Sequence, residues 1–270
     1  MTSTIAAVVF DWAGTMVDFG CVAPVEALLT AFAVEGVTIS EAEARRDMGM
    51  AKRDHLRALL ADPRVGGAWL AAHGSAAGEA DVDRLHEALE PLMRAAAAIH
   101  SELIPGAAEV IAGLRARGVR IGSSTGYTRA MMADILPLAA AQGYAPDVVV
   151  CSGETAAGRP TPLMMWKVLS DLRAWPVKAC VKIDDAEVGV AEGVAAGAWS
   201  VGLAASGNGV GLGLSAWRAL TDEDRARRTA TSAAALRAAG ADYVIDTVAD
   251  LPGVLADIER RLAAGEGPGG

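Results

Sequence analysis

The sequence predicts an α/β fold in which a doubly wound parallel sheet carries an inserted all-helical domain. Two observations lead to this prediction. Short apolar runs without polar alternation recur along the chain, and segments of helix length lie between them, as in a parallel sheet buried on both faces. One long block near the N-terminus breaks this alternation, and a chain of 270 residues has room for a core together with such an insertion.

The expected strands share a short, apolar, β-rich composition. The first covers residues 6–10 and ends abruptly at Asp11, and similar runs follow at 119–122, 147–151, 180–183, 199–203 and 242–245. Helices are expected between them at 106–117, 128–141, 162–172 and 188–196. Several of these segments end at a glycine, namely Gly118, Gly143 or Gly197, as helix C-termini often do. Alternation of this kind indicates a doubly wound sheet.

The inserted block contains amphipathic helical patterns and no convincing strand. The patterns cover residues 24–34, 40–47, 52–60 and 83–98. An all-helical block after the first strand is typical of an inserted cap, with hinges near Pro24 and Pro105. We therefore expect a Rossmann-like core made of residues 1–20 and 104–270, and a helical cap made of residues 21–103.

Charge and composition narrow the class of protein. The formal net charge is −9, and no run of Lys and Arg supplies the basic face that a nucleic-acid partner requires. The cysteines, Cys21, Cys151 and Cys180, show no paired spacing, which argues against disulfides and against a zinc site. The N-terminus lacks the basic start of a signal peptide, and no apolar run reaches about 18 residues. We expect a cytoplasmic protein with no membrane span.

The strongest functional signal is VVFDWAGT at residues 8–15. Asp11 stands at the C-terminal end of the first strand, where open α/β sheets bind their ligands. Gly14 permits a tight turn whose amides can cradle a phosphoryl group. A carboxylate in this place can attack phosphorus and form an acyl-phosphate. The competing interpretation is an aspartate that only caps the following turn.

Three further strand ends carry polar groups. Residues 122–126 follow the second strand and offer the Thr125 hydroxyl and loop amides to a phosphoryl oxygen. Arg159 is an isolated cation before a helix, suited to neutralising phosphate. Asp185 closes the fourth strand and can complete a Mg²⁺ site with Asp11. Taken singly, these are an ordinary turn, a surface arginine and a strand-end acid, but their order along successive strand ends favours a phosphoryl-transfer site.

In this order of groups the sequence resembles the haloacid dehalogenase (HAD) superfamily and, within it, the phosphonatase family. The motifs that carry the resemblance are FDWAGT at 10–15, VDFGCVAP at 17–24, MGMAKRDHLRAL at 48–59, STGYT at 124–128, GRP at 158–160 and AEGVAAGAWSVGL at 191–203. They span nearly the whole chain. The resemblance implies a HAD-like fold, Asp11 as nucleophile and Mg²⁺ held by Asp11, the Ala13 carbonyl and Asp185. It also implies that Thr125, Gly126 and Arg159 hold the phosphoryl oxygens.

Two residues give this resemblance its chemistry. Most HAD phosphatases carry an acid two residues after the nucleophile, to protonate an alkoxide leaving group, and here that position is Ala13. The resemblance implies cleavage of a carbon–phosphorus bond instead, with Lys52 forming an imine that accepts the electrons of the departing carbon. It further implies that His55, Met48, Cys21 and Tyr127 line the closed site. Without the resemblance, Lys52 reads as a surface lysine and Cys21 as a small core residue.

The local pattern around Lys52 is compatible with this role. If residues 48–56 form one helix, Met48 and His55 lie one turn on either side of Lys52 and lower the pKa of its amine, as imine formation requires. Some members of the family carry a second acid four or five residues after the metal-binding aspartate; this sequence does not, and Glu187 or a water is expected in that role. Residues 206–213 (SGNGVGLG) are Gly-rich, do not fit a dinucleotide motif, and are expected to form a flexible loop.

The predicted partner is a small-molecule phosphonate. The resemblance and the apolar residues of 24–33 also predict a homodimer through the first cap helix. Two other functions remain open at this point. One is a HAD phosphatase or phosphomutase, which Ala13 disfavours. The other is a non-catalytic metabolite-binding protein, which has little use for a nucleophile and an imine-forming lysine together.

Overall fold

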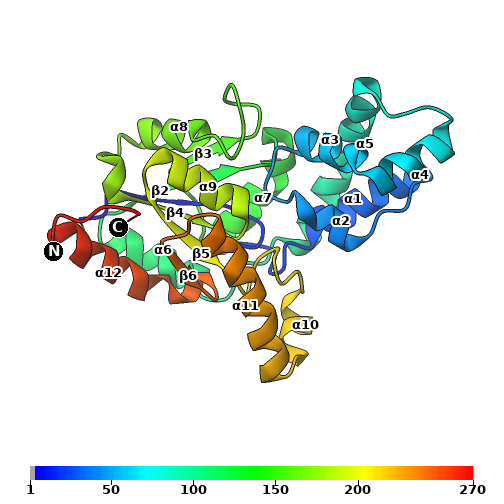
Figure 1. Ribbon diagram of the computed structural model, residues 1–270. Coiled ribbons are helices and arrows are strands. Elements are labelled where there is room, and N and C mark those ends of the chain that lie inside the picture. The colour runs from blue at the N-terminus through cyan, green and yellow to red at the C-terminus, as the bar shows by residue number, and fades with distance from the viewer. Residues whose placement is uncertain (1–3, 270) are drawn as a thin grey trace.

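A computed structural model describes residues 4–269, without the side chains of residues 97 and 98. Residues 1–3 and 270, at the two ends of the predicted core, lie outside the described residues. Within the described range one parallel sheet has the strand order β3-β2-β1-β4-β5-β6 (Figure 1). Its strands are β1 Ala7–Phe10, β2 Arg120–Thr125, β3 Val148–Cys151, β4 Cys180–Asp184, β5 Trp199–Leu203 and β6 Tyr243–Ile245. The predicted doubly wound parallel sheet is therefore confirmed.

The first strand lies in the middle of the sheet, between β2 and β4. The chain builds β2 and β3 on one side of β1 and then crosses over to build β4, β5 and β6 on the other side. In β1, Val9 pairs with Gly122 of β2 and with Lys182 of β4. This reversal of strand order opens a crevice beyond the carboxyl ends of β1 and β4, which is where ligands bind in such sheets.

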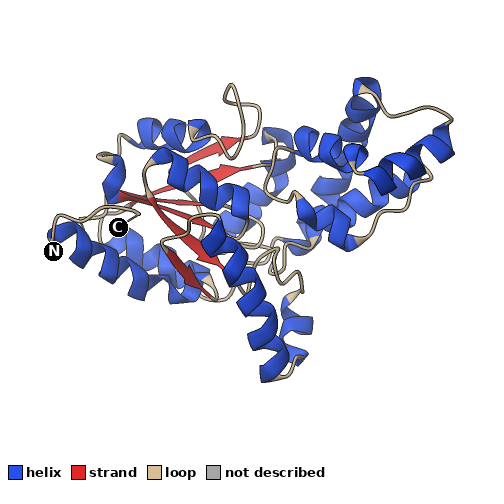
Figure 2. Cartoon of the chain, viewed as in Figure 1, coloured by secondary structure: helices blue, strands red, loops and turns tan. Residues whose placement is uncertain are grey.

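Both faces of the sheet are covered, which explains why the strands are apolar without alternation (Figure 2). Val8 and Phe10 pack into the cluster that includes α6, α7 and α12, whereas Ala7 and Val9 pack against α8 on the other face. The core helices are α6 Ala107–Ala116, α7 Arg129–Ala141, α8 Leu163–Leu172, α9 Glu187–Ala196, α10 Leu214–Ala219, α11 Asp222–Ala238 and α12 Leu251–Ala263, with short 3₁₀ turns at Val177–Ala179 and Val248–Asp250.

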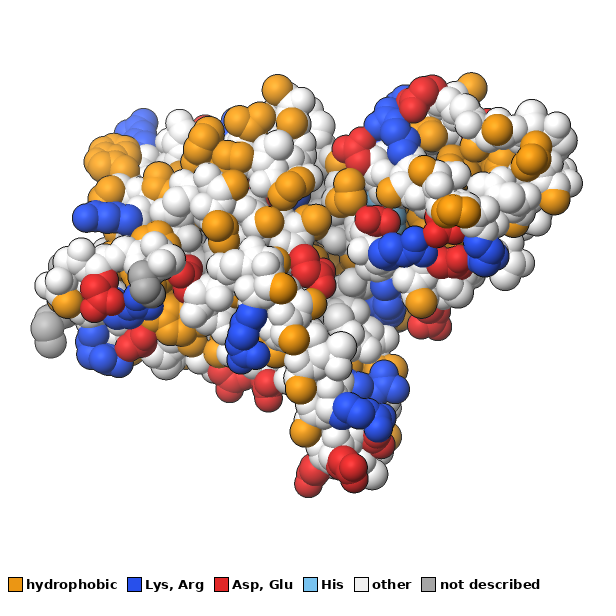
Figure 3. All heavy atoms as spheres, viewed as in Figure 1, with side chains coloured by type: hydrophobic (Ala, Val, Ile, Leu, Met, Phe, Trp, Pro, Cys, Tyr) orange, Lys and Arg blue, Asp and Glu red, His pale blue; other side chains and the backbone are white. Residues whose placement is uncertain are grey.

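The inserted block is helical, as predicted, and lies beyond the carboxyl ends of the strands (Figure 1). Its helices, called the cap below, are α1 Ala23–Val34, α2 Glu41–Arg46, α3 Lys52–Ala61, α4 Pro63–His73 and α5 Glu79–His100. Local signals start them: Ser40 and Glu43 form a capping box before α2, and Asp62 caps α4. Figure 3 shows the cap and the sheet-bearing part as two lobes with a notch between them on the face in view.

The chain leaves the core and returns to it side by side. Val17 and Leu103 form a β-bridge, the Ile104 N–H donates to the Met16 carbonyl at 2.9 Å, and the Asp18 N–H donates to the Glu102 carbonyl at 3.2 Å. The cap is thus attached by two adjacent segments. Among the described residues, no helix has the length and apolar character needed to cross a bilayer.

Several local expectations need correction. The second strand runs to Thr125, so the polar residues 123–125 belong to the strand and do not form a turn after it. Residues 48–51 are not helical, because α3 begins only at Lys52. Residues 206–213 form a loop that is largely buried and hydrogen-bonded rather than flexible. The apolar residues of α1 are mostly buried against α5 and leave Val34 as a large exposed apolar side chain at its end.

Candidate active site

Asp11 follows β1 directly and is buried, with 7% of its surface exposed. Its N–H donates to the Ile183 carbonyl at 3.0 Å, which continues the pairing of β1 with β4. One carboxylate oxygen lies 2.8 Å from Nη1 of Arg159. Burial, together with repulsion from Asp184, raises the pKa of Asp11 to about 6, against the attraction of Arg159. The ionised form of such a buried carboxylate is stabilised by positive charge nearby.

The turn after Asp11 requires a glycine. Gly14 has φ of 81°, and a Cβ at this position would lie 2.4 Å from a carboxylate oxygen of Asp185. The next residue, Thr15, donates its hydroxyl to Asp185 at 3.0 Å. The turn after β1 and the acid after β4 are therefore packed directly together, as the sequence predicts for adjacent strand ends.

Three carboxylates form a buried cluster at this edge of the sheet. Oxygen atoms of Asp11, Asp184 and Asp185 all lie within 4.8 Å of one another. Asp184 is already compensated, because Lys182 lies 3.0 Å from it and Arg159 lies 3.4 Å from it. For Asp185, burial and the charges of the other two aspartates raise the pKa well above its usual value. Hard oxygen ligands with an unmet negative charge suit a divalent cation.

Asp185 is held in place by groups from two loops. Besides Thr15, the backbone N–H of Asn208 donates to its Oδ2 at 2.7 Å. The expectation for Glu187 is wrong, since this side chain is exposed at the start of α9. Asn208 lies in the Gly-rich loop at 206–213, so the sequence contained the supporting residue in a segment that we expected to be flexible.

Arg159 is not an isolated cation. Its guanidinium contacts Asp11 at 2.8 Å and Glu192 at 3.1 Å, and it donates to the Ser124 carbonyl at 2.6 Å. Lys182 of β4, fully buried, contacts the same Glu192 at 3.1 Å and the Ser124 hydroxyl at 2.9 Å. Against the effect of burial, the charges of Asp184, Asp11 and Glu192 raise the pKa of Arg159 above its already high value. The side chain is thereby fixed against the nucleophile.

Sequence reasoning missed Lys182 and Glu192. A signal was present, since Lys182 interrupts the apolar run of β4 and a buried strand tolerates a charge only when it is paired. The partner, Glu192, lies one and a half turns along α9 and could not be assigned from spacing in the sequence.

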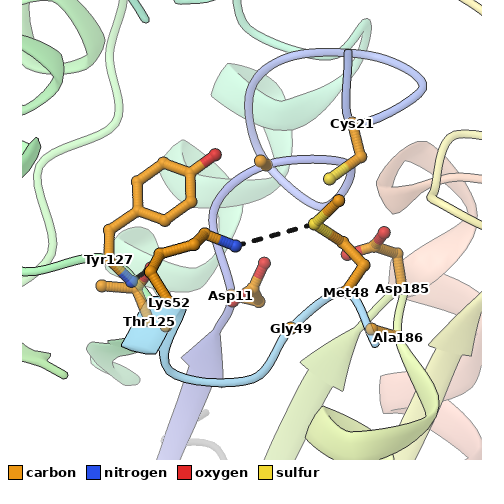
Figure 4. Close-up of a pocket in the computed structure, with 11 residues that line it drawn as sticks. Asp11, Cys21, Met48, Gly49, Lys52, Thr125, Tyr127, Asp185 and Ala186 are labelled. Carbon is orange, nitrogen blue, oxygen red and sulfur yellow. Dashed lines mark hydrogen bonds between the residues drawn. The ribbon is translucent and has the colours of Figure 1, made fainter. Parts of the chain in front are cut away.

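Lys52 is the first residue of α3 and is buried, with 2% of its surface exposed. Its Nζ lies 3.7 Å from the sulfur of Met48 and 5.4 Å from the centre of the Tyr127 ring. Figure 4 shows the amine extending between these two side chains, near Asp11. Burial lowers the pKa of Lys52. Met48 thus reaches the amine as predicted, but through a non-helical loop.

One cavity joins these groups. Its wall consists of Asp11, Ala13, Cys21, Met48, Gly49, Lys52, Thr125, Gly126, Tyr127, Asp185 and Ala186 (Figure 4). The cavity measures about 20 Å³, room for about one water molecule. Gly126 of the core meets the cap so closely that a Cβ there would lie 2.6 Å from the Met50 carbonyl oxygen. The cap is therefore closed on the core in this structure.

Two of the predicted residues lie behind the wall. Arg159 touches the cavity residue Asp11. His55 lies one turn beyond Lys52 on α3 and is fully buried, and burial with the nearby Lys52 charge lowers the pKa of His55 to about 3. Thr125 is at the wall, where its hydroxyl accepts the Tyr127 N–H at 3.1 Å.

Comparisons with known proteins agree on one family. A model of haloacid dehalogenase-like hydrolases matches residues 5–197. A phosphonoacetaldehyde hydrolase of Paraburkholderia phytofirmans is 50% identical over 98% of this chain and 99% of its own length. One from Nitratidesulfovibrio vulgaris is 45% identical over 98% of this chain and 94% of its own. The crystal structure of a phosphonoacetaldehyde hydrolase-like protein from Oleispira antarctica has a TM-score of 0.97 at 42% identity, covering 99% of this chain and 98% of that one.

Proposed function

Since the chain belongs to the phosphonoacetaldehyde hydrolase family of haloacid dehalogenase-like hydrolases, we propose that it converts phosphonoacetaldehyde and water to acetaldehyde and phosphate. One observation carries the proposal beyond the relatives' names: the carboxylate of Asp11 and the buried amine of Lys52 line the same cavity. The cavity thus offers a nucleophile for phosphorus and an amine for the aldehyde of a single small substrate.

At the phosphorus end, Asp11 is the nucleophile. Arg159, fixed by Glu192 and Ser124, neutralises charge beside it, and Thr125 with the Gly126 amide receives phosphoryl oxygens. Asp11, Asp185 and the Ala13 carbonyl would hold Mg²⁺, and all three residues line the cavity. When bound, Mg²⁺ supplies Lewis-acid stabilisation of the phosphoryl charge.

At the aldehyde end, Lys52 in its neutral form condenses with the carbonyl, releases one water and takes up one proton on nitrogen, leaving a protonated imine. Burial favours this neutral form. Asp11 then attacks phosphorus, the carbon–phosphorus bond breaks, and its electron pair moves into the protonated imine to give a neutral enamine on Lys52. Ala13 supplies no acid two residues after Asp11, and none is needed because the electron sink replaces it.

Two hydrolytic steps finish the cycle. The enamine takes up a proton at carbon, and water releases acetaldehyde and the free Lys52 amine. A second water cleaves the aspartyl-phosphate and restores Asp11. One water is released and two are consumed, so the net reaction uses one water.

We also propose the domain boundaries that entry of the substrate requires, and a homodimer. Residues 21–103 move as a cap relative to 1–20 and 104–270, because a closed cavity of about 20 Å³ cannot admit the substrate. The chain forms a homodimer through the cap, where Val34 on α1 and Ile99 on α5 are each 76% exposed.

The deciding experiment mixes purified protein, Mg²⁺ and phosphonoacetaldehyde and follows acetaldehyde with a coupled alcohol dehydrogenase. We expect acetaldehyde and phosphate in equal amounts, and loss of both in excess chelator. Borohydride added during turnover should fix the imine as a covalent adduct on Lys52. Hydrolysis of simple phosphate esters without acetaldehyde would make the protein an ordinary phosphatase. Binding of the phosphonate without turnover would make it a metabolite-binding protein.

A further inference from the structure

The loop at residues 206–213 joins the end of β5 to α10 and has glycine at alternate positions. Each of these glycines faces a different neighbour. A Cβ on Gly207 would lie 2.3 Å from the Asp185 Cβ, one on Gly209 would lie 2.3 Å from the Ser232 hydroxyl, and one on Gly211 would lie 2.8 Å from Nε of Arg45. The glycines let one loop pack at once against a metal-site acid, a core helix and the cap.

Arg45 of the cap holds this loop through hydrogen bonds. Its Nη1 donates to the Gly20 carbonyl at 2.9 Å and to the Asn208 side-chain oxygen at 3.2 Å, and its Nη2 donates to the Gly211 carbonyl at 3.0 Å. Nη1 also lies 3.3 Å from the Cys21 carbonyl. In return, the Asn208 amide nitrogen donates to the Arg45 carbonyl at 2.9 Å. A planar guanidinium suits this geometry because it presents several donors in a fixed fork.

The other side of the loop touches the catalytic edge of the sheet. The Asn208 N–H donates to Asp185 at 2.7 Å, and the Ser206 hydroxyl donates to the Gly14 carbonyl at 2.9 Å. Asp185 and Cys21, which this arrangement links, both line the cavity (Figure 4). A continuous path of hydrogen bonds therefore runs from Arg45 in the cap through Asn208 to Asp185.

We propose that Arg45 is a positioning residue that couples closure of the cap to the orientation of Asp185. With the cap closed, Arg45 fixes the 206–213 loop, and Asn208 holds the Asp185 carboxylate for the cation. With the cap open, the loop loses these contacts and Asp185 loses part of its support. Because coupling is reciprocal, Mg²⁺ binding favours the closed cap. This inference rests on the proposed function for the cation and for the movement of the cap.

The test compares Arg45→Met with Arg46→Met by titration calorimetry with Mg²⁺ alone. Arg46 is the matched control because it is the next residue of α2, and its side chain is 52% exposed and pairs with Asp62. We expect Arg45→Met to weaken Mg²⁺ binding about tenfold, the scale found when support of a metal ligand is removed, and Arg46→Met to bind as the wild type does. Small-angle scattering should show Mg²⁺ compacting the wild type more than Arg45→Met.

Equal Mg²⁺ affinity in folded Arg45→Met and wild-type protein would overturn the proposal. If Arg45→Met does not fold, Arg45→Lys and Gly207→Ala replace it. The lysine keeps the charge but only part of the contacts, and the alanine presses on Asp185 from the loop side. Wild-type affinity in both would equally overturn it. At saturating Mg²⁺, kcat of Arg45→Met should recover toward that of the wild type. Calorimetry needs no phosphonate, so failure of acetaldehyde release leaves this test intact.

Discussion

At the scale of single residues, the proposed chemistry depends on how burial changes ordinary side chains. Lys52 has the same amine as Lys167, but Lys52 is enclosed by Met48 and Tyr127, whereas the side chain of Lys167 is 41% exposed and pairs with Asp171. The enclosure favours the neutral amine, which attacks carbonyls. The Met48 sulfur adds contact without charge, so it does not offset this effect.

Replacing Lys52 separates this chemistry from the fold. We expect Lys52→Ala to lower kcat for carbon–phosphorus cleavage by on the order of 10³-fold or more and to remove the borohydride-fixed adduct, because no electron sink remains. Circular dichroism should show a folded protein, since the Lys52 amine forms no ion pair with any of the residues that the structure describes. Lys167→Ala is the matched control and should keep wild-type rates. Near-wild-type turnover by Lys52→Ala would eliminate the imine step.

The candidate site could be predicted from the sequence where position along a strand decides the role. Asp11, Thr125 and Asp185 stand at strand ends, and the parallel sheet brings them together. The family resemblance, not local pattern, supplied Lys52 and Tyr127. The sequence did not predict the roles of Lys182 and Glu192. Their roles depend on the contact between β4 and α9, which buries the two side chains side by side, and the sequence gives no measure of that distance.

At the scale of elements, tertiary contacts override local pattern in two places. Residues 48–51 have helix-compatible spacing, but Gly49 adopts φ of 92° and packs so closely on Val188 that a Cβ would lie 2.8 Å from it. This contact with the core keeps residues 48–51 out of the helix, which begins at Lys52. In β2, Ser124 continues the strand because Lys182 and Glu192 hydrogen-bond its hydroxyl. In both places the deciding contacts come from residues far away in the chain, so a short stretch of sequence could not predict the structure.

Helix α3 makes the cap sensitive to acid. Folding keeps His55 neutral, because the ring is buried near Lys52. The pKa of His55 is about 3 in the folded chain, against 6.5 in the unfolded chain. The unfolded chain therefore binds a proton that the folded chain does not. This contribution to stability is complete above pH 6.5 and is lost as the pH falls from 6.5 toward 3, by up to about 1.4 kcal/mol per pH unit.

Urea unfolding at pH 7.5 and pH 5 measures this effect. We expect the wild type to lose more stability between these conditions than His55→Leu, in which the titrating ring is absent. His86→Leu on α5 provides the matched histidine-to-leucine control, at a ring that is only half-buried. The same pH dependence in His55→Leu as in the wild type would assign the acid sensitivity to other groups.

At the scale of the whole molecule, activity depends on how closely the cap meets the core. Gly126 and Gly158 both face the cap, but with different clearance: a Cβ on Gly126 would lie 2.6 Å from the Met50 carbonyl oxygen, and one on Gly158 would lie 3.6 Å from the Ala51 Cβ. A backbone carbonyl cannot turn aside as a flexible side chain can. A methyl group at Gly126 therefore holds the two parts of the site apart.

We expect Gly126→Ala to lower kcat/KM by about 100-fold, since displacement of reacting groups by about 1 Å costs on that order. Gly158→Ala should stay within a few-fold of the wild type. Steady-state kinetics at saturating Mg²⁺ distinguish the two, with thermal unfolding to verify that both are folded. If both variants are equally active, the cap closes without contact at Gly126 during turnover.

Assembly is the second property of the whole molecule. We expect light scattering at micromolar concentration to give the mass of two chains, 55 kDa as twice 27.6 kDa. Val34→Glu together with Ile99→Glu should give single chains, because charges replace exposed apolar groups on α1 and α5. Leu138→Glu, a change at an exposed apolar residue of α7, is the control. A wild type found only as single chains would remove the dimer.

The adjacent exit and return of the chain at the base of the cap also bear on the order of events during synthesis. The cap helices, from Ala23 to His100, leave the ribosome before either neighbour of β1 exists, since β2 begins at Arg120 and β4 at Cys180. The cap helices pack on one another and can begin to condense early, whereas α5 completes its packing only when α7 of the core has been made. The nucleophile-bearing strand precedes both of its neighbours in the chain, so it is paired on one side once β2 is made and on both sides only once β4 is made, about two-thirds of the way along the 270 residues.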